Sequence, residues 1–351
     1  MPDLTSSKIP VTVLTGYLGA GKTTLLNRIL SENHGKKYAV IVNEFGEIGI
    51  DNDLIIVADE EVFEMNNGCV CCTVRGDLVR ILDGLMKRKG KFDAIIVETT
   101  GLADPAPVAQ TFFVDEDVQK NARLDAVVTV ADAKWLSDRL KDASEAKNQI
   151  AFADVIVLNK TDLVSKAELA EVEARIRGIN PYAKLHRTER CQVALSDVLE
   201  RGAFDLDRIL EIEPDFLEAG DDHDHHHHDH GHGHDHHHDH GHSHGGLKHY
   251  HDEDMQSLSL RSSKPLDATK FMPWLQDLVA SEGQKILRSK GILAFSDDDD
   301  RYVFQGVHMM LEGDHQRAWK DGEARESRLV FIGRELPEQM IRDGFERCIT
   351  T

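Results

Sequence analysis

A glycine-rich turn between an apolar strand and a helix constrains this chain more than any other part of its sequence. Residues 16–23 read Gly-Tyr-Leu-Gly-Ala-Gly-Lys-Thr, the G-x-x-x-x-G-K-[ST] pattern. A strand is expected before the turn at Ile9–Thr15 and a helix after it at Thr24–Leu30. A purely structural turn would not require the Lys-Thr pair. The pattern therefore predicts a loop that binds the phosphates of a nucleotide.

The residues of this loop have separate expected tasks. Lys22 supplies a mobile positive charge for the β- and γ-phosphates, and Thr23 supplies a hydroxyl for Mg²⁺. The glycines let successive backbone N–H groups turn inward around phosphate oxygens. The remaining contacts expected from the loop are Gly16, Gly19, Ala20, Gly21 and Thr24.

A second candidate site lies at the end of another apolar strand. Residues 95–97 are Ile-Ile-Val, Glu98 follows them, and Gly101 comes three residues later. Phosphate-loop enzymes hold Mg²⁺ at such a strand end, usually through water, and sense the γ-phosphate there. We therefore predict that Glu98 holds Mg²⁺ through a water molecule and that Lys22, Thr23 and Glu98 form the catalytic set.

A third strand ends in Asn159-Lys160-Thr161-Asp162, the N-K-x-D pattern. A carboxylate at Asp162 can accept hydrogen bonds from both N1–H and the 2-amino group of guanine. Adenine lacks that pair of donors, and a buried carboxylate left unpaired would penalise it. Alone, the pattern also suits a polar turn at a strand end. In this order after the other two motifs it favours GTP over ATP, with Asn159 and Lys160 as further contacts.

The first part of the chain alternates short apolar runs with helical patterns. The runs are rich in Val and Ile, which is typical of strands buried on both faces of a parallel sheet. They are Ile9–Thr15, Lys37–Val42, Phe92–Glu98, Leu124–Val130 and Asp154–Leu158. Such alternation predicts a doubly wound α/β nucleotide-binding domain with a mostly parallel sheet, which we assign to residues 1–219.

The composition then changes abruptly. Between Asp221 and His251 the chain holds 16 of its 20 histidines, interleaved with Asp and Gly. A segment with so little to bury is expected to stay disordered, and its imidazoles to bind divalent ions weakly, for example at His225, His226, His227 and His228. We assign the linker to residues 220–254.

A smaller α+β domain is predicted over residues 255–351. Its expected strands are Met255–Arg261, Lys285–Phe295, Arg301–Leu311 and Arg328–Gly333, and its expected helices are Ala268–Ala280 and Pro337–Arg347.

Three cysteines stand close together between the phosphate loop and Glu98. Cys69, Cys71 and Cys72 precede a helix expected to begin near Thr73. Three thiolates can converge on one tetrahedral Zn²⁺ ion and leave a position for a fourth ligand, and Co²⁺ or Cu(I) would also suit them. The helix N-terminus would favour the thiolate form. A redox pair of Cys69 and Cys72 is the alternative. In GTPases this interval carries a segment ordered by the γ-phosphate, so a nucleotide could set the metal affinity.

The overall composition argues against several classes of protein. The 351 residues include 41 basic and 62 acidic side chains, a net charge of −21, which disfavours binding to nucleic acid or to an anionic membrane. The five cysteines form no disulfide framework and suit a reducing compartment. No run of about 18 apolar residues occurs, and the first residues do not resemble a signal peptide. We expect a cytoplasmic protein.

Four segments together resemble the CobW family of metal-handling GTPases, relatives of the nickel-insertion GTPases UreG and HypB. They are Gly16–Thr24, residues 68–72, Glu98–Pro105 and Asn159–Asp162. The phosphate loop is shared by many NTPases, whereas the C-x-C-C motif placed before E-x-x-G is specific to this family. The resemblance covers nearly the whole chain, since members often carry a His-rich segment and a CobW-type C-terminal domain.

The resemblance implies a GTPase that holds zinc at the three cysteines and delivers it to a client apo-metalloenzyme, with GTP binding and hydrolysis switching the metal affinity. Glu44 and Glu47 match the family's acidic stretch after the second strand, where either could complete the metal shell or respond to the γ-phosphate. The alternatives are a cobalt-handling GTPase that supports cobalamin synthesis and a metal buffer that serves no client. A homodimer is one conceivable assembly.

Overall fold

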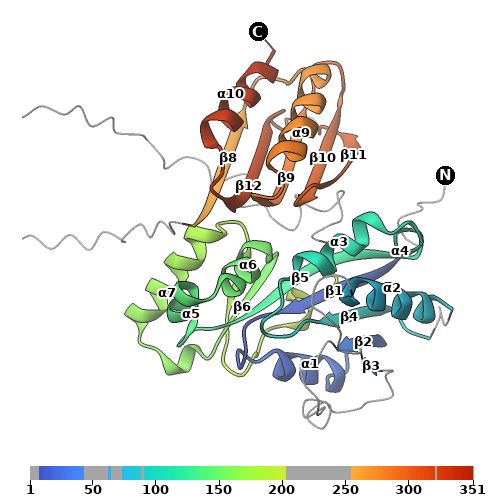
Figure 1. The fold of residues 1–351 in the computed structure, drawn as a ribbon, viewed down its shortest axis with the longest axis vertical. Coiled ribbons are helices and arrows are strands. Elements are labelled where there is room, and N and C mark those ends of the chain that lie inside the picture. The colour runs from blue at the N-terminus through green and yellow to red at the C-terminus, as the bar shows by residue number, and fades with distance from the viewer. Residues whose placement is uncertain are drawn as a thin grey trace, which may run out of the picture.

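Two sheets, each covered by helices, make up the described part of the chain (Figure 1). The computed structural model describes residues 8–42, 62–64, 73–87, 91–202, 254–320 and 322–350. The predicted fold class is confirmed: a parallel-sheet α/β domain is followed by a smaller domain with an antiparallel sheet. The predicted disordered linker lies outside the described residues.

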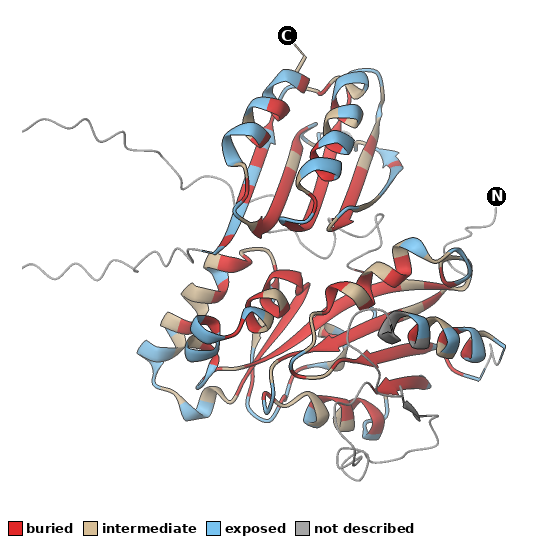
Figure 2. Cartoon of the chain, viewed as in Figure 1, coloured by how far each residue is buried: buried red, intermediate tan, exposed pale blue. Residues whose placement is uncertain are grey.

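The first sheet has the strand order β3-β2-β4-β1-β5-β6-β7, and every described pair in it is parallel. Its strands are β1 (Ile9–Thr15), β2 (Tyr38–Val42), β3 (Val62–Glu64), β4 (Ala94–Glu98), β5 (Ala122–Asp132), β6 (Val155–Asn159) and β7 (Lys184–Arg187). Every residue of β2, β4 and β6 is buried, which explains their continuous Val and Ile runs (Figure 2).

Helices connect these strands and cover the sheet. They are α1 (Lys22–Ser31), α2 (Thr73–Met86), α3 (Ala106–Val114), α4 (Glu116–Asn121), α5 (Leu136–Asp142), α6 (Ser144–Phe152) and α7 (Lys166–Ile179), with short 3₁₀ turns η3 (Thr161–Leu163) and η4 (Leu195–Asp197). In Figure 1, α1 lies below the sheet, and α3 and α6 lie above it, toward the second sheet. Helix α2 begins at Thr73, as predicted.

The second sheet has the order β11-β10-β9-β12-β8 and is antiparallel. Its strands are β8 (Met255–Ser262), β9 (Ile286–Ala294), β10 (Asp300–Val307), β11 (Met310–Ala318) and β12 (Ser327–Arg334), and its helices are α9 (Ala268–Glu282) and α10 (Glu338–Cys348).

One predicted strand is wrong. The apolar run 301–311 was expected to be a single strand, but the chain reverses at His308 and Met309 and pairs β10 with β11. His308 has a φ of 52°, a left-handed backbone conformation that breaks a strand. Apolar residues on both sides of the turn conceal it in the sequence.

The second sheet has an apolar surface on each face. Along β12, Leu329 and Phe331 belong to a core formed with α9 and α10, whereas Val330 and Ile332 belong to the core of the first domain. This alternation follows the two-residue period of a strand. Contacts of β9 with α6, of β8 with α7 and of β11 with α3 join the two domains.

A buried carboxylate ties the two domains together. Asp154 precedes β6 and is 3% exposed. One of its oxygens lies 2.6 Å from Nη2 of Arg288 and 3.0 Å from Nζ of Lys290, both in β9. The other accepts a hydrogen bond from the backbone N–H of Val127 at 2.8 Å. Buried cations require such a partner, because water does not solvate them there.

The substitution Asp154→Asn should destabilise the protein by about 3–5 kcal/mol, because it removes the buried carboxylate that pairs with two buried cations. Chemical denaturation measures this as a lower midpoint. Asp254→Asn is the matched control: Asp254 also crosses between the domains, to Lys147, but its side chain is 71% exposed. Exposed pairs contribute little, so its midpoint should barely move. Equal midpoints for the two variants would contradict the role given to Asp154.

Candidate functional site

The three predicted nucleotide motifs meet at one edge of the parallel sheet. The phosphate loop follows β1, Gly101 follows β4, and Lys160 follows β6. Strands β4, β1, β5 and β6 are consecutive neighbours in the sheet, so their carboxyl ends lie side by side. In open α/β sheets ligands bind at this edge, where the strand order reverses.

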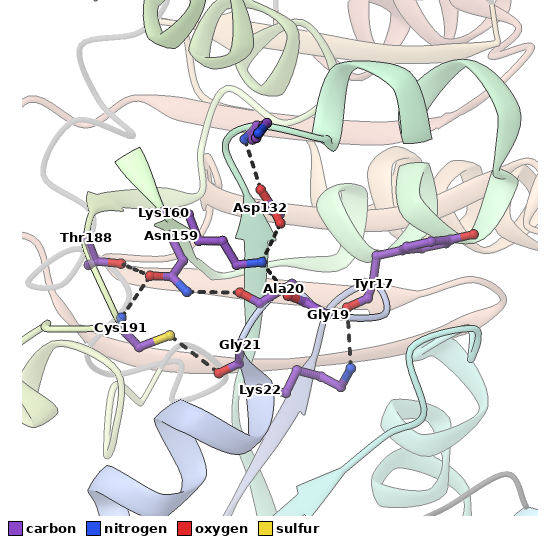
Figure 3. A network of polar contacts seen from close by, with 11 residues as sticks. Tyr17, Gly19, Ala20, Gly21, Lys22, Asp132, Asn159, Lys160, Thr188 and Cys191 are labelled. Carbon is purple, nitrogen blue, oxygen red and sulfur yellow. Dashed lines mark hydrogen bonds and ion pairs between the residues drawn. The ribbon is translucent and has the colours of Figure 1, made fainter. Parts of the chain in front are cut away.

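The phosphate loop is held by the first two residues of the N-K-x-D motif (Figure 3). Nδ2 of Asn159 donates to the carbonyl oxygen of Ala20 at 2.9 Å, and Nζ of Lys160 donates to that of Gly19 at 2.7 Å. Gly21 has a φ of 118°, and a Cβ there would lie 2.6 Å from Nδ2 of Asn159. Glycine is therefore required where the loop meets Asn159.

Asn159 also joins the loop to the segment after β7. Its Oδ1 accepts hydrogen bonds from the backbone N–H of Cys191 at 2.8 Å and from Oγ1 of Thr188 at 3.3 Å. The Cys191 thiol lies 3.4 Å from the carbonyl oxygen of Gly21, to which it donates. Burial raises the pKa of this thiol to about 11, so it is neutral and structural rather than nucleophilic.

Two side chains that sequence reasoning missed complete this network. Asp132, the last residue of β5, lies 2.7 Å from Nζ of Lys160 and fixes that side chain over the loop. Its position, a polar residue ending an apolar strand, is the same signal that pointed to Glu98 and could have found it. Cys191 carries no comparable signal, since its role depends on a contact with Gly21, 170 residues away.

The predicted Mg²⁺ ligands lie on neighbouring elements. Thr23 is in the first turn of α1, and Glu98 is the last residue of β4, 7% exposed and in register with Leu14 of β1. Nζ of Lys22 donates to the carbonyl oxygen of Gly16 at 2.8 Å, within the phosphate loop.

Two other residues predicted to contact the nucleotide are exposed. Thr24 lies in α1, and Asp162 lies in η3, the short turn that follows Lys160. A penalty for binding adenine would require a buried carboxylate at Asp162. In the structure Asp162 is exposed.

The other predicted metal ligands, those for zinc or cobalt and those of the histidine-rich segment, fall outside the described residues. These are Glu44, Glu47, Cys69, Cys71, Cys72, His225, His226, His227 and His228. Within the described residues, no group of three or more His, Cys, Asp or Glu side chains is arranged to hold a metal ion. No helix in this described part is long and apolar enough to cross a membrane.

A phosphate loop after the first strand of a parallel sheet, with E-x-x-G and N-K-x-D at neighbouring strand ends, defines a P-loop nucleotide-binding domain of the GTPase type. The family model of the CobW/HypB/UreG nucleotide-binding domain matches residues 10–187, and that of the cobalamin synthesis protein cobW C-terminal domain matches residues 255–349. The chain therefore belongs to the CobW family, as its motifs suggested.

Curated relatives resemble the chain over nearly its whole length. The zinc chaperone YjiA of Escherichia coli (strain K12) is 33% identical over 96% of this chain and 98% of the relative. The zinc-regulated GTPase metalloprotein activator 1 of Schizosaccharomyces pombe is 35% identical over 95% of this chain and 84% of the relative. The crystal structure of Zn(II)-bound YjiA GTPase from E. coli matches with a TM-score of 0.72 and 30% identity, covering 98% of this chain and 99% of the other.

Proposed function

We propose that this protein is a GTP-hydrolysing zinc chaperone that transfers zinc to a client apo-metalloprotein in the cytoplasm. The observation that carries the proposal is the full-length similarity, through both domains, to relatives named zinc chaperones and zinc-regulated GTPases. The C-x-C-C motif of this chain, directly before α2, supplies thiolates that suit zinc. The proposed reaction converts GTP and water to GDP and phosphate.

The nucleotide half of the proposal rests on the edge of the parallel sheet. Lys22 and the backbone N–H groups of residues 16–24 would bind the phosphates, and Asp162 would read the guanine. Asn159 and Lys160 would act mainly through the loop carbonyls that they hold. A hydroxyl at Thr23 and a carboxylate at Glu98 suit Mg²⁺, which when bound neutralises charge on the phosphates.

The metal half rests on residues outside the described ranges. Zinc is the cargo in this proposal: Cys69, Cys71 and Cys72 would hold it, with Glu44 or Glu47 as the fourth ligand. The histidines of residues 220–254, between the proposed domains 1–219 and 255–351, would bind further ions weakly. Cobalt is the alternative cargo, supported by the cobalamin-synthesis description of the family that matches residues 255–349.

A competition titration tests the coupling of metal to nucleotide. Zinc and cobalt would be titrated against a chelator in a variant lacking residues 221–251, with either GDP or a non-hydrolysable GTP analogue and Mg²⁺. We expect one Cys-dependent ion whose affinity differs between the two nucleotides. A hundredfold change requires only ~2.7 kcal/mol of coupling. An affinity indifferent to the nucleotide would instead indicate a metal buffer, and stronger binding of cobalt would favour cobalt delivery.

The substitution Asp162→Asn should lower the preference for GTP over ATP by about tenfold or more, because the carboxylate that accepts both guanine donors is lost. Competition with a fluorescent nucleotide measures both affinities. Asp117→Asn is the matched control, since Asp117 is also exposed but pairs only locally with Lys120. If the ratio of the GTP and ATP affinities were unchanged in Asp162→Asn, Asp162 would not be a residue that recognises the base.

A further inference from the structure

Gln149 is a buried polar side chain that none of the sequence motifs includes. It lies in α6 and is 1% exposed. Its Nε2 donates two hydrogen bonds, each of 3.1 Å, to the carbonyl oxygens of Gly101 and Ala103 in the loop after β4. Both amide hydrogens are therefore used on a single loop, the one that follows Glu98.

The same loop is fixed at its beginning by β1. The backbone N–H of Thr99 donates to the carbonyl oxygen of Leu14 at 2.9 Å, and its Oγ1 donates to Oγ1 of Thr15 at 2.8 Å. The loop is therefore held at two points, at Thr99 by β1 and at Gly101 by Gln149 of α6. Since the peptide group is planar and trans, holding the carbonyl of Gly101 also sets the direction of the next N–H, which points away from Gln149.

Gly101 contacts the phosphate loop directly. A Cβ at Gly101 would lie 2.6 Å from the backbone nitrogen of Leu18, the third residue of the phosphate loop. There is consequently no room between the two loops for a side chain. A small displacement of Gly101 would change the position of its backbone relative to the phosphates that the neighbouring loop is expected to bind.

Helix α6 is itself held in place. Oγ1 of Thr129 in β5 donates to the backbone carbonyl of Gln149 at 2.7 Å. Nδ2 of Asn148 donates to Asp104 at 2.8 Å, and its Oδ1 accepts from Arg334 of the second domain at 2.7 Å. Because α6 is held by these contacts, Gln149 fixes the position of the loop, and the loop does not determine the position of Gln149.

We infer that Gln149 is a positioning residue for GTP hydrolysis: it holds Gly101 at the location where the γ-phosphate is sensed. This inference rests on the proposed function. In P-loop GTPases the loop after the acidic strand end responds to the γ-phosphate, which GDP lacks. Gln149 therefore acts on the binding and turnover of GTP and hardly on the binding of GDP.

The test is Gln149→Met in the full chain. Methionine keeps the length and the packing of the side chain but removes both donors. Affinities for GDP and for a non-hydrolysable GTP analogue, both with Mg²⁺, would be measured with fluorescent nucleotides, and kcat by phosphate release. We expect the GTP analogue to bind about tenfold more weakly, GDP to change less than about twofold, and kcat to fall about tenfold or more.

Asn180→Leu is the matched control. The buried Asn180 amide donates to the carbonyl oxygens of Ile150, Ala151 and Ala153 at 2.9, 3.3 and 2.9 Å, at the C-terminal end of the same helix, directly after Gln149. Its loss removes buried hydrogen bonds to α6 and to the backbone N–H groups of Tyr182 and Ala183, none of which involves the loop after β4. This variant should be less stable, yet its ratio of GTP-analogue to GDP affinity should match that of the wild type.

A second substitution keeps the inference testable if Gln149→Met does not fold. Thr129→Val removes only the hydrogen bond to the carbonyl of Gln149 and should shift the same ratio in the same direction, by a smaller factor. If the affinities for GDP and for the GTP analogue fell equally, or if neither changed, the positioning role of Gln149 would be overturned. The proposed function would still stand if the wild type hydrolysed GTP. A wild type that neither bound nor hydrolysed GTP would overturn both.

Discussion

Replacing Cys71 by serine is expected to abolish tight zinc binding and leave GTP binding within about twofold of the wild type. Cys71 is the middle of three cysteines within four residues directly before α2. A serine hydroxyl stays protonated at neutral pH and cannot replace a thiolate ligand. Loss of one direct ligand should weaken zinc by on the order of a hundredfold or more, since even outer-shell changes cost 10–100-fold.

The measurement is a zinc titration against a chromophoric chelator, with residues 221–251 removed from both proteins so that histidines do not obscure the site. Cys348→Ser is the matched control. Cys348 lies in α10, is 2% exposed, and its thiol donates to the carbonyl oxygen of Gly344 at 3.2 Å. That variant should keep one tightly bound zinc.

Two results would contradict the assignment of Cys71. Unchanged zinc affinity in Cys71→Ser would place the metal elsewhere in the chain. Simultaneous loss of GTP binding would show that the cysteine segment and the nucleotide site are not separable. A reversible disulfide between Cys69 and Cys72, with no stoichiometric metal in the wild type, would favour the redox alternative.

The parts of the fold that the sequence predicts are those set by local patterns. Strand β1 at Ile9–Thr15 and the start of α2 at Thr73 match the prediction, because an apolar run and its flanking turn residues act over a few positions. The predicted end of a strand is wrong where no residue in the sequence marks a turn. At His308 a positive φ divides the predicted strand into two.

The contacts that the sequence does not predict join residues far apart in the chain. The motif that contains Asn159 gives no sign that its amide holds Ala20, 139 residues earlier. Gln149 holds Gly101, 48 residues earlier, and the sequence around this glutamine gives no sign of the contact. Such pairings depend on the strand order of the sheet, which local periodicity does not encode.

A network of side chains holds the backbone of the phosphate loop. Asn159, Lys160 and Cys191 all bind carbonyl oxygens of the loop. These contacts fix the path of the loop backbone around the position at which a phosphate ligand is expected. The side chain expected to add charge at that ligand is Lys22.

Replacing Lys22 by alanine is expected to lower kcat for GTP hydrolysis by about 10²–10³-fold, because an ammonium group that stabilises charge on the transferred phosphoryl group is lost. Nζ of Lys22 lies 2.8 Å from the carbonyl oxygen of Gly16, so the side chain already lies over the phosphate loop. Single-turnover phosphate release at saturating GTP separates this effect from weaker binding. Lys120→Ala, which breaks an exposed pair with Asp117, should leave kcat unchanged.

The same variant distinguishes a zinc chaperone driven by hydrolysis from one driven by nucleotide binding alone. Lys22→Ala retains all three cysteines, so one zinc should still bind in the absence of nucleotide. If hydrolysis resets the metal site, the variant mixed with GTP should keep the zinc affinity of its GTP-bound state. The zinc affinity of the wild type should instead change to that of the GDP-bound state as phosphate is released. A kcat of Lys22→Ala within a few-fold of the wild-type value would show that Lys22 does not take part in the reaction. Identical zinc affinities before and after phosphate release in the wild type would show that hydrolysis does not control the metal.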